Sequence, residues 1–169
     1  MYLLLMRHAK SSWDEAGLKD YDRPLSNRGR RDAPKMGQFL KNSGYKPDLI
    51  ISSPAKRAME TTGLVAESAG IEKDRIEWND DFYFSSVNSY LESISRVNSG
   101  INKLLLVGHN PLMEELLDLI IVGKDSGSFI FPTAAVACIE VQNRQWKRIE
   151  TGMNSLKWFV IPKILDSAE

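Results

Sequence analysis

The sequence is poor in the residues that form disulfides or hold metal ions. Cys138 is the one cysteine of the chain, so no disulfide can form within it, and its apolar neighbours indicate a buried structural thiol. Only two histidines occur, His8 and His109, and neither lies in a cluster of Cys or acidic residues, which argues against a zinc site. The sequence therefore predicts no metal and no cofactor, and the lack of disulfides suits a cytoplasmic protein.

The sequence also lacks an excess of charge and a long hydrophobic run. Lysine plus arginine number 22, and so do aspartate plus glutamate, which predicts neither a nucleic-acid partner nor membrane-surface binding. The longest apolar stretch, residues 116–122, is far too short to span a membrane, and residues 1–6 lack the features of a signal peptide. A length of 169 residues fits one domain, so we expect a single domain over residues 1–169.

Short apolar runs alternate with longer amphipathic segments along the chain. The short runs predict strands at residues 2–6, 48–52, 104–107, 136–141, 146–150 and 157–161. Apolar residues at helical spacing predict helices at residues 32–43, 55–69, 87–97 and 111–121. Pro34 implies either that the first helix begins near Asp32 or that it is bent there. We expect an α/β fold, with three α/β/α layers, a largely parallel central sheet and antiparallel strands near the C-terminus.

Four basic side chains follow the predicted strands. Arg7 and His8 end the first strand, His109 follows the third, and Arg57 opens the helix after the second. The carboxyl ends of parallel strands meet at one edge of a sheet, so these residues are expected to lie together. Guanidinium groups bind phosphate oxygens, and a neutral imidazole can act as a nucleophile. These residue types indicate an anion site, although satisfied histidines and surface arginines are the alternative.

Several motifs resemble those of the histidine phosphatase superfamily, also called phosphoglycerate-mutase-like. The segment Leu-Met-Arg-His-Ala-Lys at residues 5–10 is similar to its Arg-His-Gly signature, with Ala9 in place of glycine. Residues 52–61, 107–111 and 24–29 resemble the second motif, the third motif and the segment that opens the first helix. The short length and the lack of insertions resemble the SixA branch of small phosphohistidine phosphatases.

The resemblance implies a role for each matching residue. His8 would attack phosphorus and carry the phosphoryl group, while Arg7, Arg57 and His109 would bind it in the substrate phosphate pocket. Family members commonly add an acidic general acid. Asp81 is the best positional candidate for that acid and Asp80 the next, and a solvated turn is the alternative interpretation of both.

The resemblance leaves the substrate open. The leading hypothesis is metal-independent hydrolysis of phosphohistidine on a protein, because a protonated imidazole leaves as a neutral molecule and needs no strong enzyme acid. A small phosphorylated metabolite is the alternative substrate. A mutase is disfavoured because the chain lacks the length to close over a bisphosphate. A catalytically silent module that binds phosphoproteins also remains open.

Overall fold

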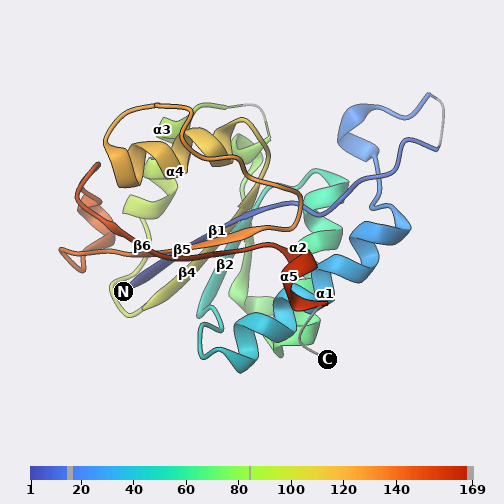
Figure 1. Cartoon of the computed structure of the whole chain (residues 1–169), viewed down its shortest axis with the longest axis horizontal. Helices are drawn as coiled ribbons and strands as arrows, with labels where there is room; N and C mark the ends of the chain where they lie inside the picture. The colour runs from blue at the N-terminus through green and yellow to red at the C-terminus, as the bar shows by residue number, and fades with distance from the viewer. Residues whose placement is uncertain (15–16, 84, 167–169) are drawn as a thin grey trace.

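A six-stranded mixed sheet forms the centre of the protein (Figure 1). The structure, a computed structural model, describes residues 1–14, 17–83 and 85–166. The strand order is β3-β2-β4-β1-β5-β6, in which β3, β2, β4 and β1 are mutually parallel and β5 and β6 are antiparallel to their neighbours. The strands are β1 (Tyr2–Arg7), β2 (Leu49–Ser52), β3 (Ile76–Trp78), β4 (Lys103–Gly108), β5 (Val136–Glu140) and β6 (Ser155–Val160).

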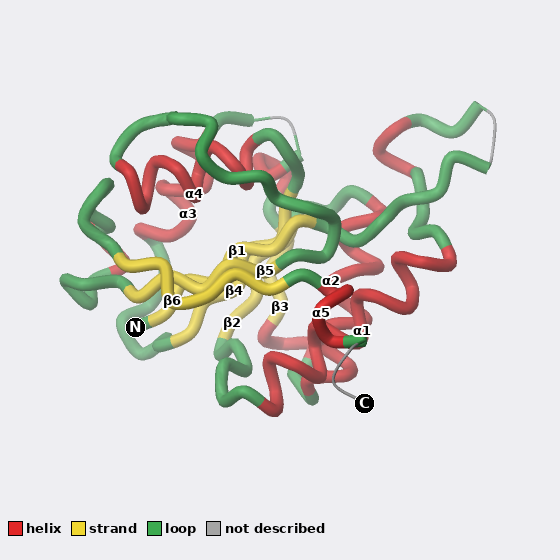
Figure 2. Tube along the Cα trace, in the orientation of Figure 1, coloured by secondary structure: helices red, strands yellow, loops and turns green. Residues whose placement is uncertain are grey.

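Helices cover both faces of the sheet (Figure 2). One layer holds α1 (Asn27–Asn42), α2 (Lys56–Ala69) and the short α5 (Pro162–Leu165), and the other holds α3 (Val87–Ser95) and α4 (Leu112–Val122). In the part of the chain that the structure describes, four 3₁₀ turns lie between the larger elements: η1 (Asp20–Asp22), η2 (Lys73–Arg75), η3 (Asp80–Phe82) and η4 (Trp146–Arg148). The predicted three-layer arrangement with a largely parallel sheet is confirmed.

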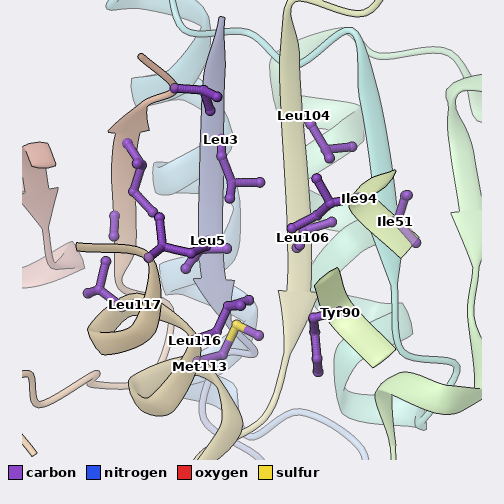
Figure 3. Packing of buried hydrophobic residues seen from close by; sticks show 14 of the residues in the cluster. Leu3, Leu5, Ile51, Tyr90, Ile94, Leu104, Leu106, Met113, Leu116 and Leu117 are labelled. Atoms are coloured by element: carbon purple, nitrogen blue, oxygen red, sulfur yellow. The ribbon is translucent and has the colours of Figure 1, made fainter. Parts of the chain in front are cut away.

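The apolar runs of β1 and β4 are buried because the sheet is covered on both sides. Leu3 and Leu5 point toward α4, whereas Leu4 belongs to the cluster under α1 and α2. Figure 3 shows this packing on the α3–α4 side, where Leu106 of β4 lies among residues such as Met113. Alternate side chains thus enter different cores, which is why these strands are apolar throughout rather than alternating.

The strands differ from the prediction in two places. Residues 146–150 do not form a strand, because the chain turns there as η4 to bury Trp146, whose indole N–H donates to the carbonyl of Ile101 at 2.8 Å. The strand β3 was not predicted. It has three residues on the edge of the sheet, Glu77 and Trp78 are exposed, and so it presents no apolar run.

The first helix begins well before Asp32. Ser26 caps α1 by accepting a hydrogen bond from the backbone N–H of Gly29 at 3.2 Å, so Pro34 lies inside the helix. The first turn contains no apolar side chain, which hid this start from the periodicity. Gly29 sits against the chain after β1, since a Cβ there would lie 2.3 Å from the carbonyl oxygen of Lys10.

The remaining helices and the cysteine follow the predictions closely. Gly70 and Gly123 end α2 and α4 with φ values of 66° and 87°, in the left-handed region that glycine favours. Cys138 is fully buried in β5, and burial raises the pKa of its thiol to about 12. Among the described residues, no helix has both the length and the apolar character needed to cross a membrane.

Candidate active site

The carboxyl ends of β1 and β4 bring the two histidines together. The two strands are parallel and in register, with Arg7 opposite Gly108, and the backbone N–H of His8 donates to the carbonyl of Gly108 at 3.0 Å. The imidazole rings of His8 and His109 lie 4.9 Å apart between centroids. The convergence of strand ends that the sequence indicates is therefore present in the fold.

Arg57 reaches this pair from the first turn of α2. Its Nε atom donates to Nε2 of His8 at 3.2 Å, and the residue is buried. The strand β2 leads directly into this turn, because the backbone N–H of Ser53 continues the β2–β4 pairing by donating to the carbonyl of Val107. The sheet register thus fixes where the guanidinium group enters.

The hydrogen bonds of His8 define its tautomer. Nδ1 lies 2.7 Å from the carbonyl oxygen of Ala9, which can only accept, so the ring proton is on Nδ1. Nε2 then carries a lone pair, consistent with the N–H of Arg57 that points at it. The backbone N–H of Ala9 is in turn fixed by the hydroxyl of Thr61 at 3.0 Å. His8 is therefore a neutral imidazole held in a single orientation.

The environment keeps both histidines uncharged. Burial, the neighbouring His109 and the two arginines lower the pKa of His8 to about 3, although the hydrogen bond to Ala9 opposes this. Burial and the charges of Arg57 and Arg7 lower the pKa of His109 to about 4, partly offset by Asp20. At neutral pH the site thus contains two neutral imidazoles between two cationic guanidinium groups.

His109 is oriented by a serine that the sequence reasoning missed. The hydroxyl of Ser53 lies 2.9 Å from Nε2 of His109 and accepts from the backbone N–H of Ala55 at 3.3 Å. A hydroxyl can donate or accept, so this contact fixes the orientation of the ring with either tautomer. Nδ1 is buried and has no hydrogen-bond partner among the described residues, and with the ring proton on Nδ1 it would donate to an incoming oxyanion.

Arg7 is anchored by the loop before β5. Its Nη1 donates to the carbonyl of Phe131 at 2.8 Å, and its buried Nε has no partner in the described part of the chain. Glu114 on α4 holds that loop by accepting from the backbone N–H of Phe131 at 2.8 Å and from the amide of Asn110 at 2.6 Å. The loop, α4 and β1 together fix one edge of the Arg7 guanidinium, and its Nε keeps an N–H without a hydrogen-bond partner among the described residues.

The carboxylate of Asp20 also belongs to the site, although no sequence pattern predicts it. It accepts hydrogen bonds from Arg57 Nη2, Arg23 Nη1 and the hydroxyl of Tyr83, each at 2.9 Å. Burial raises the pKa of Asp20, but the hydrogen bonds from Tyr83 and the two arginines outweigh it and lower the pKa overall. Asp20 lies in a polar loop that holds several acidic residues, and no periodic pattern separates it from Asp22.

The predicted acid does not join this group. Asp80 and Asp81 lie on η3 with exposed side chains, and neither lines the cleft beside the histidines. The cleft has a volume of about 820 Å³ and is lined by residues that include Asp20, Arg57, Tyr83, His109 and Asn110. Of the five predicted site residues, the structure gathers Arg7, His8, Arg57 and His109 and leaves Asp81 outside.

No group of three His, Cys, Asp or Glu residues suited to a metal ion occurs within residues 1–14, 17–83 and 85–166. The donors that do converge are guanidinium N–H groups and imidazole nitrogens. Such a set suits a multiply charged oxyanion, because the guanidinium groups stay charged at any working pH.

Known proteins are similar to this chain in sequence and in fold. The sequence profile of the histidine phosphatase superfamily (branch 1) matches residues 3–82. An uncharacterised protein of Mycobacterium tuberculosis is 33% identical over 168 residues, which span 94% of this chain and 100% of that protein. Together with a solved SixA structure from Agrobacterium tumefaciens that is 30% identical over nearly its whole length, this profile match shows that the chain belongs to the histidine phosphatase superfamily.

Within the superfamily, the chain is similar to SixA proteins along its whole length. Phosphohistidine phosphatase SixA of Escherichia coli is 25% identical over 175 residues, which cover 100% of this chain and 99% of SixA. A crystal structure from Agrobacterium tumefaciens, assigned as phosphohistidine phosphatase SixA, has a TM-score of 0.78 and 30% identity over 95% of this chain and 97% of that one. The predicted phosphoglycerate-mutase-like fold and the resemblance to the SixA branch are confirmed.

Proposed function

We propose that this protein is a metal-independent phosphatase that forms a phosphohistidine intermediate on His8, in a single domain over residues 1–169. One observation carries the proposal: His8 donates from Nδ1 to Ala9, so its Nε2 lone pair faces Arg57 between two cationic side chains. Nε2 thus has an electron pair for attack on phosphorus, and the Arg57 guanidinium beside it can bind the incoming phosphate. Membership of the superfamily supports the same chemistry.

The first step is attack of His8 Nε2 on phosphorus. The bond from phosphorus to the leaving group breaks as the bond to Nε2 forms, and the N–H of Arg57 turns from Nε2 to a phosphoryl oxygen. The lowered pKa of His8 means that no proton must be removed before attack. The positive charge that develops on the ring is stabilised by the carbonyl oxygen of Ala9.

Three side chains bind the transferred group. The free Nε of Arg7, the guanidinium of Arg57 and the unpartnered Nδ1 of His109 supply donors for its oxygens. Fixed donors in a buried site stabilise the charge of phosphoryl transfer without reorganisation. The predicted phosphate-binding roles of Arg7, Arg57 and His109 are part of this proposal.

The substrate we propose is phosphohistidine on a protein. An imidazole protonated on its far nitrogen leaves as a neutral molecule, whereas an alkoxide needs a proton from the enzyme. No acid at the predicted position lines the cleft, since Asp81 lies outside it. The relatives named SixA are phosphohistidine phosphatases, which supports the same substrate class.

The test is hydrolysis by EDTA-treated protein of a phosphohistidine peptide and of p-nitrophenyl phosphate. His8→Asn keeps a side-chain donor near Ala9 but removes the nucleophile, and it is expected to lower turnover by at least about 10³-fold. Arg57→Ala is expected to lose about 10²-fold or more, while Arg31→Ala, an exposed arginine on α1, serves as its matched control.

Each outcome of these assays supports one of the functional hypotheses. Preference for the peptide over p-nitrophenyl phosphate and sugar phosphates supports the protein substrate, and the reverse preference indicates a small-molecule phosphomonoesterase. Phosphopeptide binding without any turnover by the wild type indicates the silent binding module. Activity that survives in His8→Asn contradicts the proposed intermediate, and activity that disappears with EDTA contradicts metal independence.

A further inference from the structure

Asp20 sits on the far side of Arg57 from the nucleophile. One guanidinium group links the two residues: its Nε donates to His8 Nε2 at 3.2 Å and its Nη2 donates to Asp20 Oδ2 at 2.9 Å. A phosphoryl group on Nε2 would lie beside the same guanidinium. The carboxylate is therefore one residue removed from the reacting nitrogen and faces the cleft.

The carboxylate is both held in place and open to water. Three donors from different elements fix it: Arg57 on α2, Arg23 after η1, and Tyr83 after η3. Arg57 Nη1 also donates to the backbone carbonyl of Asp20 at 2.6 Å, which ties η1 itself to the site. Even so, 52% of the Asp20 side chain is exposed. Asp20 thus combines a fixed position in the lining of the cleft with access to water.

The geometry of phosphoryl transfer gives this position a role. Attacking and leaving atoms lie roughly in line through phosphorus, so the leaving group departs from the face opposite His8, and the water of the second step must attack on that same face. Asp20 lines the cleft and half of its side chain is exposed, so water in the cleft can reach its carboxylate. We infer that Asp20 is the general base of the second step, which orients the attacking water and takes its proton.

The step balances without any other reactant. The water oxygen forms a bond to phosphorus, the bond from phosphorus to His8 Nε2 breaks, and its electron pair returns to the imidazole. One water proton passes to Asp20, which releases it to solvent through its exposed edge. The products are inorganic phosphate, neutral His8 and an ionised Asp20, ready for the next cycle.

The same residue helps to select the substrate. Its hydrogen bonds lower the pKa of Asp20, so it enters the first step ionised and has no proton to give. Leaving groups must then carry their own proton or be stable as anions, which describes phosphohistidine and p-nitrophenyl phosphate but not sugar phosphates. The ionised carboxylate can also accept a hydrogen bond from the far N–H of a phosphoimidazole.

This inference rests on the proposed function, and the experiment separates the two. The wild type, Asp20→Asn and Asp22→Asn are each mixed with phosphoramidate and quenched in base, because phosphohistidine is stable in base. The fraction of phosphorylated protein is then measured by intact-protein mass spectrometry. Asn keeps an oxygen that accepts from Arg57 but cannot take a proton, so it tests base chemistry rather than positioning. Asp22→Asn removes the same charge from an exposed neighbour on η1 that does not line the cleft.

We expect Asp20→Asn to become phosphorylated as fast as the wild type and then to accumulate the phosphoenzyme, with hydrolysis slowed about 10²-fold. Asp22→Asn is expected to match the wild type. Three results would overturn the inference and leave the proposed function intact. In the first, Asp20→Asn has the phosphoenzyme level and turnover of the wild type. In the second, Asp20→Asn forms the phosphoenzyme more slowly but hydrolyses it normally, and in the third the phosphoenzyme accumulates in Asp81→Asn instead. An inactive wild type that never becomes phosphorylated would contradict the proposed function, and this inference with it.

Discussion

Acid should destabilise this protein through His8, and the size of the effect can be worked out from its pKa. An unfolded chain gives histidine a pKa of 6.5, whereas the folded protein lowers that of His8 to about 3. Between these two pKa values the unfolded state binds a proton at this histidine and the folded state does not. The free energy of unfolding therefore rises with pH across this range and decreases as the pH falls below 6.5.

The magnitude follows from the distance between the two pKa values. At pH 4.5 the unfolded histidine is almost fully protonated while folded His8 remains neutral, and the two pH units below 6.5 correspond to about 3 kcal/mol. His109, with a folded pKa of about 4, adds a similar contribution at this pH. Each contribution is a large fraction of the total stability of an ordinary domain, which is about 5–15 kcal/mol, and the two are not additive because the rings interact.

The assay is urea unfolding at pH 7.0 and pH 4.5, followed by circular dichroism, for wild type and His8→Asn. Carboxylates also titrate in this range, but they contribute almost equally to both proteins and cancel in the comparison. The loss of stability on acidification is expected to be about 2–3 kcal/mol smaller in His8→Asn, because asparagine does not titrate. Equal losses in the two proteins would refute the reasoning, since they would mean that His8 titrates normally in the folded state.

Three further predictions follow from the site and the packing. Arg57→Lys should lower kcat/KM for p-nitrophenyl phosphate by about 10²-fold, because lysine cannot replace the fork of donors, while Arg31→Lys should leave it unchanged. Gly29→Ala should lower the free energy of unfolding by about 2–3 kcal/mol in thermal unfolding, because its Cβ would lie 2.3 Å from a backbone carbonyl oxygen. The control Gly63→Ala, where a Cβ meets open space, should be neutral or stabilising. Equal melting temperatures for the two variants would contradict this packing. Cys138 should react with a thiol reagent only in urea, and rapid labelling of the native protein would show that the thiol is accessible.

The sequence predicted the parts of the site that follow from parallel strands. Strand ends meet at one edge of the sheet, so Arg7, His8 and His109 could be placed together from apolar runs alone, and Arg57 from the helix start after β2. The tautomer of His8 could not be predicted, because it depends on the direction of a single carbonyl group.

The incorrect predictions have a common physical cause. They concern segments in which contacts between distant parts of the chain decide the conformation, rather than the local pattern of apolar and polar residues. Asp20 reaches the site through a loop whose path is set by its bonds to Arg57 and Arg23. Asp81 follows a short edge strand with no apolar signature, so its distance from the cleft could not be judged. The turn at Trp146 forms because a buried indole finds a carbonyl partner, which no periodicity records.

The most direct test of the account is to locate the phosphoryl group on the trapped enzyme. Protein quenched in base during turnover of phosphoramidate is digested and mapped by mass spectrometry, and the intact phosphoprotein is examined by ³¹P NMR. The account predicts one phosphoryl group per chain, on Nε2 of His8, because Nδ1 is occupied by its bond to Ala9. A phosphoryl group on Ser53, on His109 or on Nδ1 of His8, or continued turnover with no phosphoenzyme in any variant, would contradict it.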